Sequence, residues 1–263
     1  MMNSELKKKS AIVCGSTQGI GKAVAVQLAA MGANVTLLAR DEQKLKQSKS
    51  ELPAGGGQLH SYLVADFNDP DALSELVQQF IRRNGPVNIL VNNTGGPAAG
   101  PVYKAQKEQF LAAFNQHLIC NHLLVQACAE GMKNAGYGRI INIISTSVKQ
   151  PLPNLGVSNT IRAAVANWSK TLANELGKEG ITVNNVLPGA TATQRLASII
   201  KNKSEKTGMT EEQVSREMLH EIPLGRFAKP EEVAAAVAFL ASPAAAYING
   251  INLPVDGGRT ASL

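Results

Sequence analysis

Three glycines in one short segment are placed where they could hold a phosphate group. Gly15, Gly19 and Gly21 lie in CGSTQGIG, between a short apolar run and a longer run with helical periodicity. Because glycine has no side chain, such positions permit a tight turn and let a pyrophosphate approach the backbone, where a helix N-terminus supplies N–H donors. The spacing is G-x-x-x-G-x-G rather than G-x-G-x-x-G, so the segment alone is also compatible with a plain tight turn.

A permanently charged side chain follows at the end of the next predicted strand, where the order is Ala39, Arg40, Asp41. A site for NAD would present an acid here to the ribose 2′-hydroxyl, whereas the planar guanidinium of Arg40 suits a 2′-phosphate. The sequence therefore favours NADP over NAD. The alternative is that Arg40 is an ordinary surface residue, and Asp41 is expected in either case to cap the next helix.

The spacing of nucleophiles and metal ligands does not support other chemistries. No G-x-S-x-G pattern surrounds Ser145, Ser147 or Ser158, which disfavours a hydrolase. The four histidines contain no HExxH pair, and His117 and His122, five residues apart, would not share a helix face. No metal site is expected.

Apolar runs of two periodicities alternate along the chain and define the elements that must position these residues. The predicted strands cover residues 10–15, 34–39, 58–65, 87–92, 138–144, 181–187 and 251–255. The predicted helices begin at about Gly19, Asp41 and Asp69 and then cover 110–133, 161–178 and a helix-rich segment at 194–242. Such alternation predicts an α/β fold: one Rossmann-like, doubly wound parallel sheet of about seven strands with helices on both faces.

One large α/β sheet can absorb all 263 residues, so a single dinucleotide-binding and catalytic domain is expected over residues 1–263. A polar and charged segment at about residues 194–222 follows the sixth predicted strand. Because ligands bind beyond the carboxyl ends of the strands in such sheets, this segment is predicted to form a mobile lid over the pocket. A solvated pair of helices is the alternative interpretation.

The composition, with 44% hydrophobic and 17% charged residues, is typical of a globular protein with a large core. The net charge of +6 includes one basic run, Lys7, Lys8 and Lys9, but aromatic residues are only 4%, so no stacking platform for nucleic acid accompanies it. The apolar residues 233–241 are about half the length of a membrane-spanning helix and are expected to form a core helix. No signal peptide is indicated.

The cysteines Cys14, Cys120 and Cys128 form no even disulfide framework and are expected to be buried thiols in a reducing cytoplasm.

Several segments resemble the short-chain dehydrogenase/reductase family, especially its 3-oxoacyl-acyl-carrier-protein reductase-like members. CGSTQGIG resembles the family's TGxxxGIG loop with Cys14 in place of threonine, and NNTGG resembles NNAG with Thr94 in place of alanine. VNNVLPGATAT resembles the PGxxxT segment near the nicotinamide. IPLGRFAKPEEVAAAVAFLAS and INGINLPVDGG resemble the closing segments, which often contribute to a homotetramer. The resemblance runs nearly end to end, with the motifs in the family's order.

The resemblance implies a dinucleotide site assembled from these motifs, with Asp66 and Phe67 beside the adenine. The implied cofactor-binding residues are Gly15, Ser16, Thr17, Gly19, Ile20, Gly21, Arg40, Asp66, Phe67, Asn92, Asn93, Gly95, Arg162, Pro188, Gly189, Thr191 and Thr193. NADP is the expected cofactor, and NAD is less favoured. The expected substrate is a small-molecule or acyl-thioester carbonyl compound, without nucleic acid or membrane partners, and the expected assembly is a homotetramer or homodimer.

The resemblance also implies a catalytic set, and here the residues depart from the family. Family members usually act with a serine, a tyrosine, a lysine and an asparagine. Ser145, at the end of GRIINIIS, matches the serine that polarises the substrate carbonyl, whereas Ser158 and Arg162 stand at the tyrosine and lysine positions. Alignment of the preceding helix places His117 at the asparagine position. Three of the four positions have therefore changed residue type.

Carbonyl reduction needs a hydride from the nicotinamide and a proton at the carbonyl oxygen. The hydroxyl of Ser158 is a far weaker acid than a phenol, and Arg162 can stabilise an oxyanion or hold the nicotinamide ribose but does not readily release a proton. His117, with an unperturbed pKa of about 6.5, is the predicted donor, directly or through water and Ser158. The alternatives are that His117 is a packing residue and that Lys149 is the donor.

Intact cofactor motifs beside an altered catalytic set are compatible with two functions. The first, which we favour, is an NADP(H)-dependent oxidoreductase with an atypical proton donor, acting on a carbonyl or a secondary alcohol. The second is a catalytically silent NADP(H)-binding protein that senses redox state or partners an active subunit. Turnover distinguishes the two, and cofactor binding does not.

Overall fold

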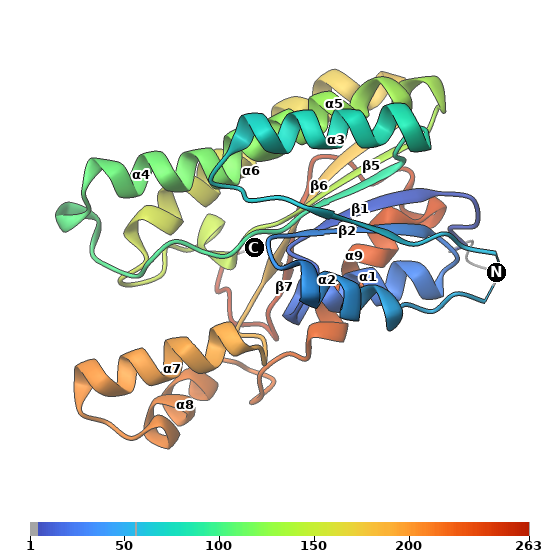
Figure 1. Cartoon of the computed structure of the whole chain (residues 1–263). Helices are drawn as coiled ribbons and strands as arrows, with labels where there is room; N and C mark the ends of the chain where they lie inside the picture. The colour runs from blue at the N-terminus through green and yellow to red at the C-terminus, as the bar shows by residue number, and fades with distance from the viewer. Residues whose placement is uncertain (1–4, 56, 263) are drawn as a thin grey trace.

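The described residues form one seven-stranded parallel sheet with helices on both faces (Figure 1). The computed structural model describes residues 5–55 and 57–262, so residues 1–4, 56 and 263 of the predicted domain lie outside the described residues. The strands are β1 (Ser10–Cys14), β2 (Asn34–Ala39), β3 (Ser61–Val64), β4 (Ile89–Asn92), β5 (Gly138–Ile143), β6 (Ile181–Pro188) and β7 (Asn252–Val255). Their order is β3-β2-β1-β4-β5-β6-β7, which confirms the predicted fold class.

The strand order reverses at β1, and this reversal positions the site. β1 pairs with β2 on one side and with β4 on the other, in parallel. The loops that follow β1 and β4 therefore leave the same edge of the sheet in different directions, and ligands of doubly wound sheets bind in the crevice between such loops. The glycine-rich segment follows β1, and Asn93 to Gly96 follow β4.

Two layers of helices cover the sheet (Figure 1). One face carries α1 (Gly19–Ala30), α2 (Glu42–Ser50) and α9 (Pro230–Ala241). The other carries α3 (Pro70–Asn84), α4 (Lys107–Phe114), α5 (Cys120–Asn134) and α6 (Gly156–Leu176). As predicted, Asp41 caps α2, and Asp69 likewise caps α3; each carboxylate accepts a hydrogen bond from a backbone N–H group at 3.0 Å.

Buried apolar side chains form a core on each side of the sheet. Val233, Val237 and Leu240 of α9 are fully buried against α1 and the sheet, which confirms that residues 233–241 form a core helix.

Cys14, Cys120 and Cys128 are free buried thiols, as expected. Burial raises the pKa of Cys120 and Cys128 to about 12, so these thiols are unreactive at neutral pH. In the part of the chain described, no helix has both the length and the apolarity to cross a bilayer.

Two predicted helix boundaries were wrong, and both lie near the candidate site. The helix predicted over 110–133 is α4 and α5 joined by a π-helical turn, Asn115–Ile119, which contains His117. A π turn inserts an extra residue, so apolar periodicity alone does not reveal it, and such turns are frequent at functional sites. Helix α6 begins at Gly156 rather than at about 161, and Gly156 packs against Val102: a Cβ on Gly156 would lie only 2.5 Å from the Val102 backbone nitrogen. Ser158 and Arg162 therefore both lie on α6, one turn apart.

The segment predicted as a lid forms two helices, α7 (Gln194–Thr207) and α8 (Glu211–His220), which extend beyond the end of the sheet (Figure 1). Leu196 and Ile200 of α7 pack against Val214 of α8, with Phe227 beside them. This small apolar cluster is separate from the two cores that cover the sheet. The helical pair thus holds together through contacts of its own.

Candidate active site

The glycine-rich turn after β1 is packed so closely that it has no space for a side chain at Gly15 or Gly21. Gly15 and Gly19 have φ values of +59° and +53°, in the left-handed region that favours glycine. A Cβ on Gly21 would overlap the carbonyl oxygen of Gly15, and a Cβ on Gly15 would lie 2.7 Å from the carbonyl oxygen of Asn93. Helix α1 begins at Gly19, so its free N–H groups lie in this turn. The cradle fits a dinucleotide pyrophosphate, as the sequence predicts.

Two polar side chains assigned to the cofactor by the resemblance hold this turn in place. Asn93 donates from Nδ2 to the carbonyls of Cys14 and Gly15, at 3.2 and 3.3 Å. The fully buried hydroxyl of Ser16 accepts a hydrogen bond from the backbone N–H of Leu38 at 3.0 Å. These bonds tie the turn to the ends of β4 and β2, so both side chains have a supporting role that the sequence did not reveal.

Arg40 and Asp66 meet beside this cradle, at the ends of β2 and β3. Nη1 of Arg40 lies 4.0 Å from Oδ2 of Asp66, and both side chains are largely exposed. Asp66 also accepts hydrogen bonds from the backbone and side chain of Asn68 at 2.9 Å. The next residue, Phe67, is partly buried, and its carbonyl accepts a hydrogen bond from the thiol of Cys120. The exposed guanidinium of Arg40, at the carboxyl ends of β2 and β3, suits a ribose 2′-phosphate.

The side chain of Asn92 points into the strand layer. It is 1% exposed and donates to Oδ1 of Asn142 on β5 at 2.8 Å. Asn142 in turn donates to Ser169 of α6 and to Asn185 of β6. A buried network of this kind rigidifies neighbouring strands when its members are satisfied. The network is incomplete at Asn92, whose Nδ2 links β4 to β5 but whose buried Oδ1 has no partner among the described residues.

The segment after β6 faces the glycine-rich turn across the crevice. A Cβ on Gly19 would lie 3.1 Å from Cγ2 of Thr193, so the two segments are in near contact. The hydroxyl of Thr193 caps α7, and that of Thr191 donates to the carbonyl of Gly189 at 3.1 Å. The structure thus brings the predicted segments 15–21 and 188–193 together.

His117 is buried and hydrogen-bonded beside the end of β4. It is 2% exposed, and its Nδ1 lies 2.6 Å from Oγ1 of Thr94. Burial and the charge of Arg162 lower the pKa of His117 to about 3, with the Gly95 backbone opposing the shift. At neutral pH the imidazole is therefore uncharged. The prediction of His117 as donor used the unperturbed pKa of about 6.5, and the sequence did not reveal the burial or the neighbouring cation that lower it.

Arg162 is 7% exposed and is anchored to the end of β5. Its Nη1 donates to the carbonyl of Ile143 at 3.0 Å, whereas its buried Nε has no hydrogen-bond partner among the described residues. Burial, followed by the charge of Arg195, lowers the pKa of Arg162 to about 10. The guanidinium is still cationic at neutral pH, so it can stabilise negative charge but cannot donate a proton readily.

Ser145 and Ser158 flank this arginine. Ser145 follows β5, and its hydroxyl accepts a hydrogen bond from the backbone of Ser147 at 3.1 Å. Ser158 precedes Arg162 by one turn of α6. Lys149, the second donor candidate, ends the short 3-10 turn Thr146–Val148 and is itself engaged in an interaction within the fold.

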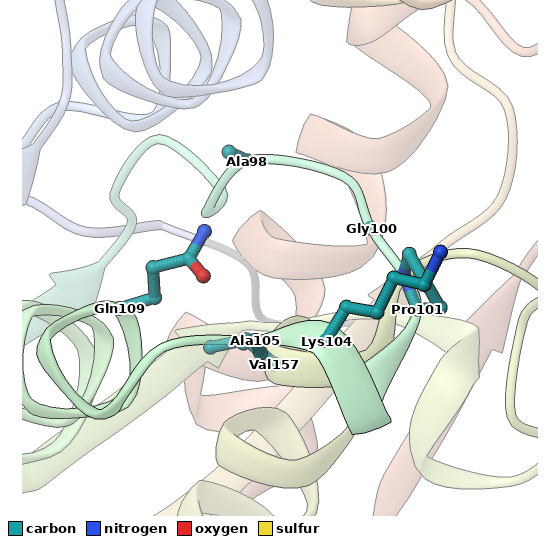
Figure 2. Close-up of a pocket in the computed structure, with 7 residues that line it drawn as sticks. All are labelled: Ala98, Gly100, Pro101, Lys104, Ala105, Gln109 and Val157. Carbon is teal, nitrogen blue, oxygen red and sulfur yellow. The ribbon is translucent and has the colours of Figure 1, made fainter.

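A cavity of about 130 Å³ opens beside the first turn of α6 (Figure 2). The loop after β4 and the start of α4 form most of its wall, and the buried Val157, the neighbour of Ser158, completes it. The amide of Gln109 points toward Ala98 across this space (Figure 2). The loop is fixed to α6 by backbone hydrogen bonds from Gly100 to Asn154 and from Gly156 to Gly100, at 2.7 and 3.0 Å. The cavity therefore lies beside the turn of α6 that carries Ser158.

The structure therefore brings His117 and Arg162 together at the carboxyl ends of β4 and β5, with Ser145 just after β5 and Ser158 one turn before Arg162 on α6. Sequence reasoning missed Thr94 as the partner of His117 and missed Arg195, which lies in the first turn of α7. A charged residue two positions after Thr193 was visible in the sequence, but no spacing rule connects it to Arg162. Within residues 5–55 and 57–262, no group of three His, Cys, Asp or Glu side chains could hold a metal ion.

Known proteins match this chain over nearly its whole length, in sequence and in structure. A family model described as enoyl-(acyl carrier protein) reductase matches residues 15–260. The chain is 30% identical to the NADPH-dependent reductase BacG of Bacillus subtilis, over 98% of this chain and 100% of that protein. It is 32% identical to the 3-oxoacyl-[acyl-carrier-protein] reductase FabG of Chlamydia muridarum, over 98% and 99% of the two chains. L-sorbose reductase from Gluconobacter frateurii, solved with NADPH and L-sorbose, superimposes with a TM-score of 0.92 at 30% identity over 100% of both chains. The chain therefore belongs to the short-chain dehydrogenase/reductase family and is close to its ketoacyl reductases.

Proposed function

We propose that this protein is an NADP(H)-dependent oxidoreductase that reduces a carbonyl compound, 3-oxoacyl compounds among the candidates, with an atypical proton donor. The observation that carries the proposal is the closely packed glycine turn after β1, with Arg40 following the adjacent β2. A relative named for NADPH-dependent reduction and one solved with NADPH share the complete fold and support this choice of cofactor.

The residues around the cradle would hold the cofactor by distinct contacts. The N–H groups of Thr17, Gly19 and Ile20, at the start of α1, suit the pyrophosphate, and Arg40 suits the 2′-phosphate. Asp66 and Phe67 would border the adenine. Gly95, Pro188, Gly189, Thr191 and Thr193 would border the nicotinamide half, where a Cβ on Gly95 would meet open space.

The nicotinamide supplies a hydride to the carbonyl carbon when the cofactor is bound. The hydroxyl of Ser145 would polarise the carbonyl oxygen, and the buried cation of Arg162 would stabilise the negative charge that develops there. Preorganised charge in a site that excludes water is among the largest contributions to catalysis. We assign the proton to water relayed by Ser158, since His117 carries no extra proton at neutral pH.

Turnover of NADPH tests the proposal. Purified protein is expected to oxidise NADPH in the presence of one or more members of a panel of β-ketoacyl thioesters, diketones, quinones and sugars. Arg162→Ala is expected to reduce the rate by about 10²-fold, the size of the loss of one oxyanion contact. Tight NADPH binding without turnover on any member of the panel would overturn the proposal.

One observation favours a second function, a catalytically silent NADP(H)-binding sensor or partner subunit. The donor predicted from the sequence is uncharged at neutral pH, and Arg162 retains its proton. A silent protein would bind NADPH, show no turnover and change its state of association with the redox state of the cofactor. Light scattering in NADPH and in NADP⁺ tests this, and it also tests our proposal, drawn from the family resemblance, of a homotetramer or homodimer.

A further inference from the structure

Two arginines from different elements converge on the loop after β4. A Cβ on Gly96 would lie 3.5 Å from Nη2 of Arg195 and 3.7 Å from Nη2 of Arg162. Arg162 comes from α6 and Arg195 from the first turn of α7. Nη2 of Arg195 also donates to the carbonyl of Pro97 at 3.1 Å, which holds the side chain over this loop. Two positive charges therefore share one small space above Gly96.

This pair of charges has no counter-ion in the described part of the chain. Neither arginine takes part in a salt bridge among residues 5–55 and 57–262. The charge of Arg195 lowers the pKa of Arg162, which shows that the two groups repel each other. Nε of Arg162 is buried without a partner. A buried arginine is ordinarily paired, so this arrangement is suited to an anion.

The position of the pair indicates which anion. The places suited to the phosphates of the cofactor are the cradle at Gly15 to Gly21 and the exposed Arg40. Arg162 is instead anchored to Ile143 at the end of β5, two residues before Ser145 and one turn after Ser158. The two arginines therefore lie near Ser145 and Ser158, the residues proposed to act at the substrate carbonyl, rather than at the places suited to the cofactor phosphates.

We propose that Arg162 and Arg195 bind a carboxylate of the substrate, so that the substrate is a 2-oxo or 3-oxo acid. This inference rests on the proposed function and names its substrate class. In such acids the carboxylate lies one or two bonds from the carbonyl, so a guanidinium with several donors can contact both groups. The hydride forms a C–H bond at the carbonyl carbon, the C=O π bond breaks toward oxygen, the oxygen takes a proton from water, and the nicotinamide is oxidised. The product is the hydroxy acid.

The turnover experiment compares matched acids and esters with NADPH: pyruvate with methyl pyruvate, and acetoacetate with methyl acetoacetate. The acids are expected to have a kcat/KM at least about 10-fold higher than that of their esters, because one charge-assisted hydrogen bond contributes a binding free energy of about this size. Arg195→Gln is expected to lower kcat/KM for the acids by about 10-fold or more and to change that for the esters by less than about twofold. Arg216→Gln, an exposed arginine of α8 paired with Glu212, is the matched control and is expected to leave both unchanged.

A binding experiment separates failure of this inference from failure of the proposed function. Oxamate, a carboxylate that cannot be reduced by hydride transfer, is titrated calorimetrically into the NADPH-loaded protein and its Arg195→Gln variant. Oxamate binding that Arg195→Gln weakens about 10-fold supports the carboxylate site even if no carbonyl compound is turned over. Equal turnover of acids and esters overturns the inference while the reductase function stands. Loss of NADPH affinity in Arg195→Gln, with oxamate binding unchanged, overturns it in favour of a cofactor phosphate.

Discussion

Thr94 and His117 are joined at 2.6 Å, between Oγ1 and Nδ1, and this contact connects the end of β4 to the π-helical turn between α4 and α5. Both are positions at which the sequence resemblance predicts a departure from the residues common in the family. The threonine hydroxyl gives the buried imidazole a partner that an alanine could not provide. The pair therefore forms one structural unit, with Arg162 close enough for its charge to affect the imidazole.

Replacement of His117 by glutamine should change how stability depends on pH. The folded pKa of about 3 lies below the ordinary value of 6.5, so between these values the unfolded chain binds a proton that the folded chain does not. The contribution of neutral His117 to the free energy of unfolding is therefore fully present above pH 6.5 and is lost as the pH falls toward 3. The free energy of unfolding should fall by about 1.5 kcal/mol between pH 6.5 and 5. Urea unfolding at pH 7, 6 and 5 should show this loss in the wild type and not in His117→Gln. Parallel curves for the two proteins would contradict it, and the exposed His220→Gln serves as control.

Substitution of Arg40 should discriminate between the two nicotinamide cofactors. Arg40→Ala removes the cation at the end of β2, and we expect the Kd for NADPH to rise about 10- to 100-fold because a charge-assisted hydrogen bond is lost. The Kd for NADH should change by less than about twofold. Calorimetry with both cofactors measures this. Arg82→Ala, in the last turn of α3, is the control. Equal weakening of both cofactors would show that Arg40 does not read the 2′-phosphate.

Introduction of a methyl group at Gly21 should disrupt the cradle. A Cβ at this position would overlap the carbonyl of Gly15, so the backbone of the turn must move. We expect Gly21→Ala to lower the free energy of unfolding by about 1–3 kcal/mol, as overpacking does, and to abolish measurable NADPH binding. Gly55→Ala, where a Cβ would meet nothing within 4 Å, should change neither. Thermal unfolding with and without NADPH checks both variants.

A phenol at position 158 should accelerate the reaction if proton supply limits it. Ser158→Tyr introduces the residue type that the family resemblance predicts for this position, one turn before the cation of Arg162, which favours the ionised phenol. A general acid contributes about 10²–10⁴ in rate, so we expect kcat to rise about 10²-fold on an accepted substrate. Ser158→Phe has the same bulk without the acid and should not accelerate turnover. A rise in both variants would indicate a packing effect instead.

Cofactor binding should order the helical pair α7 and α8, which we propose acts as a lid. Thr193 lies near Gly19 at the base of α7, and Arg195 already reaches the carbonyl of Pro97 across the crevice. Hydrogen exchange of residues 194–222 is therefore expected to slow on addition of NADPH, whereas the amides of α3 remain unchanged. Unchanged exchange in α7 and α8 would favour a simple solvated pair of helices.

The sequence by itself determined the fold, and it predicted the cofactor end of the site. Alternating strand and helix periodicities specify a parallel sheet. Glycines at 15, 19 and 21 indicate a tight turn between a strand and a helix, because such a turn depends on the local freedom of the backbone. Only the tertiary structure decided the protonation and burial of the residues predicted to be catalytic. The pKa of His117 depends on burial and on Arg162, which is 45 residues away in the sequence, and Arg195 meets Arg162 only because α7 folds back over the loop after β4. Such properties arise from desolvation and from charges brought together by folding, and no local spacing encodes them.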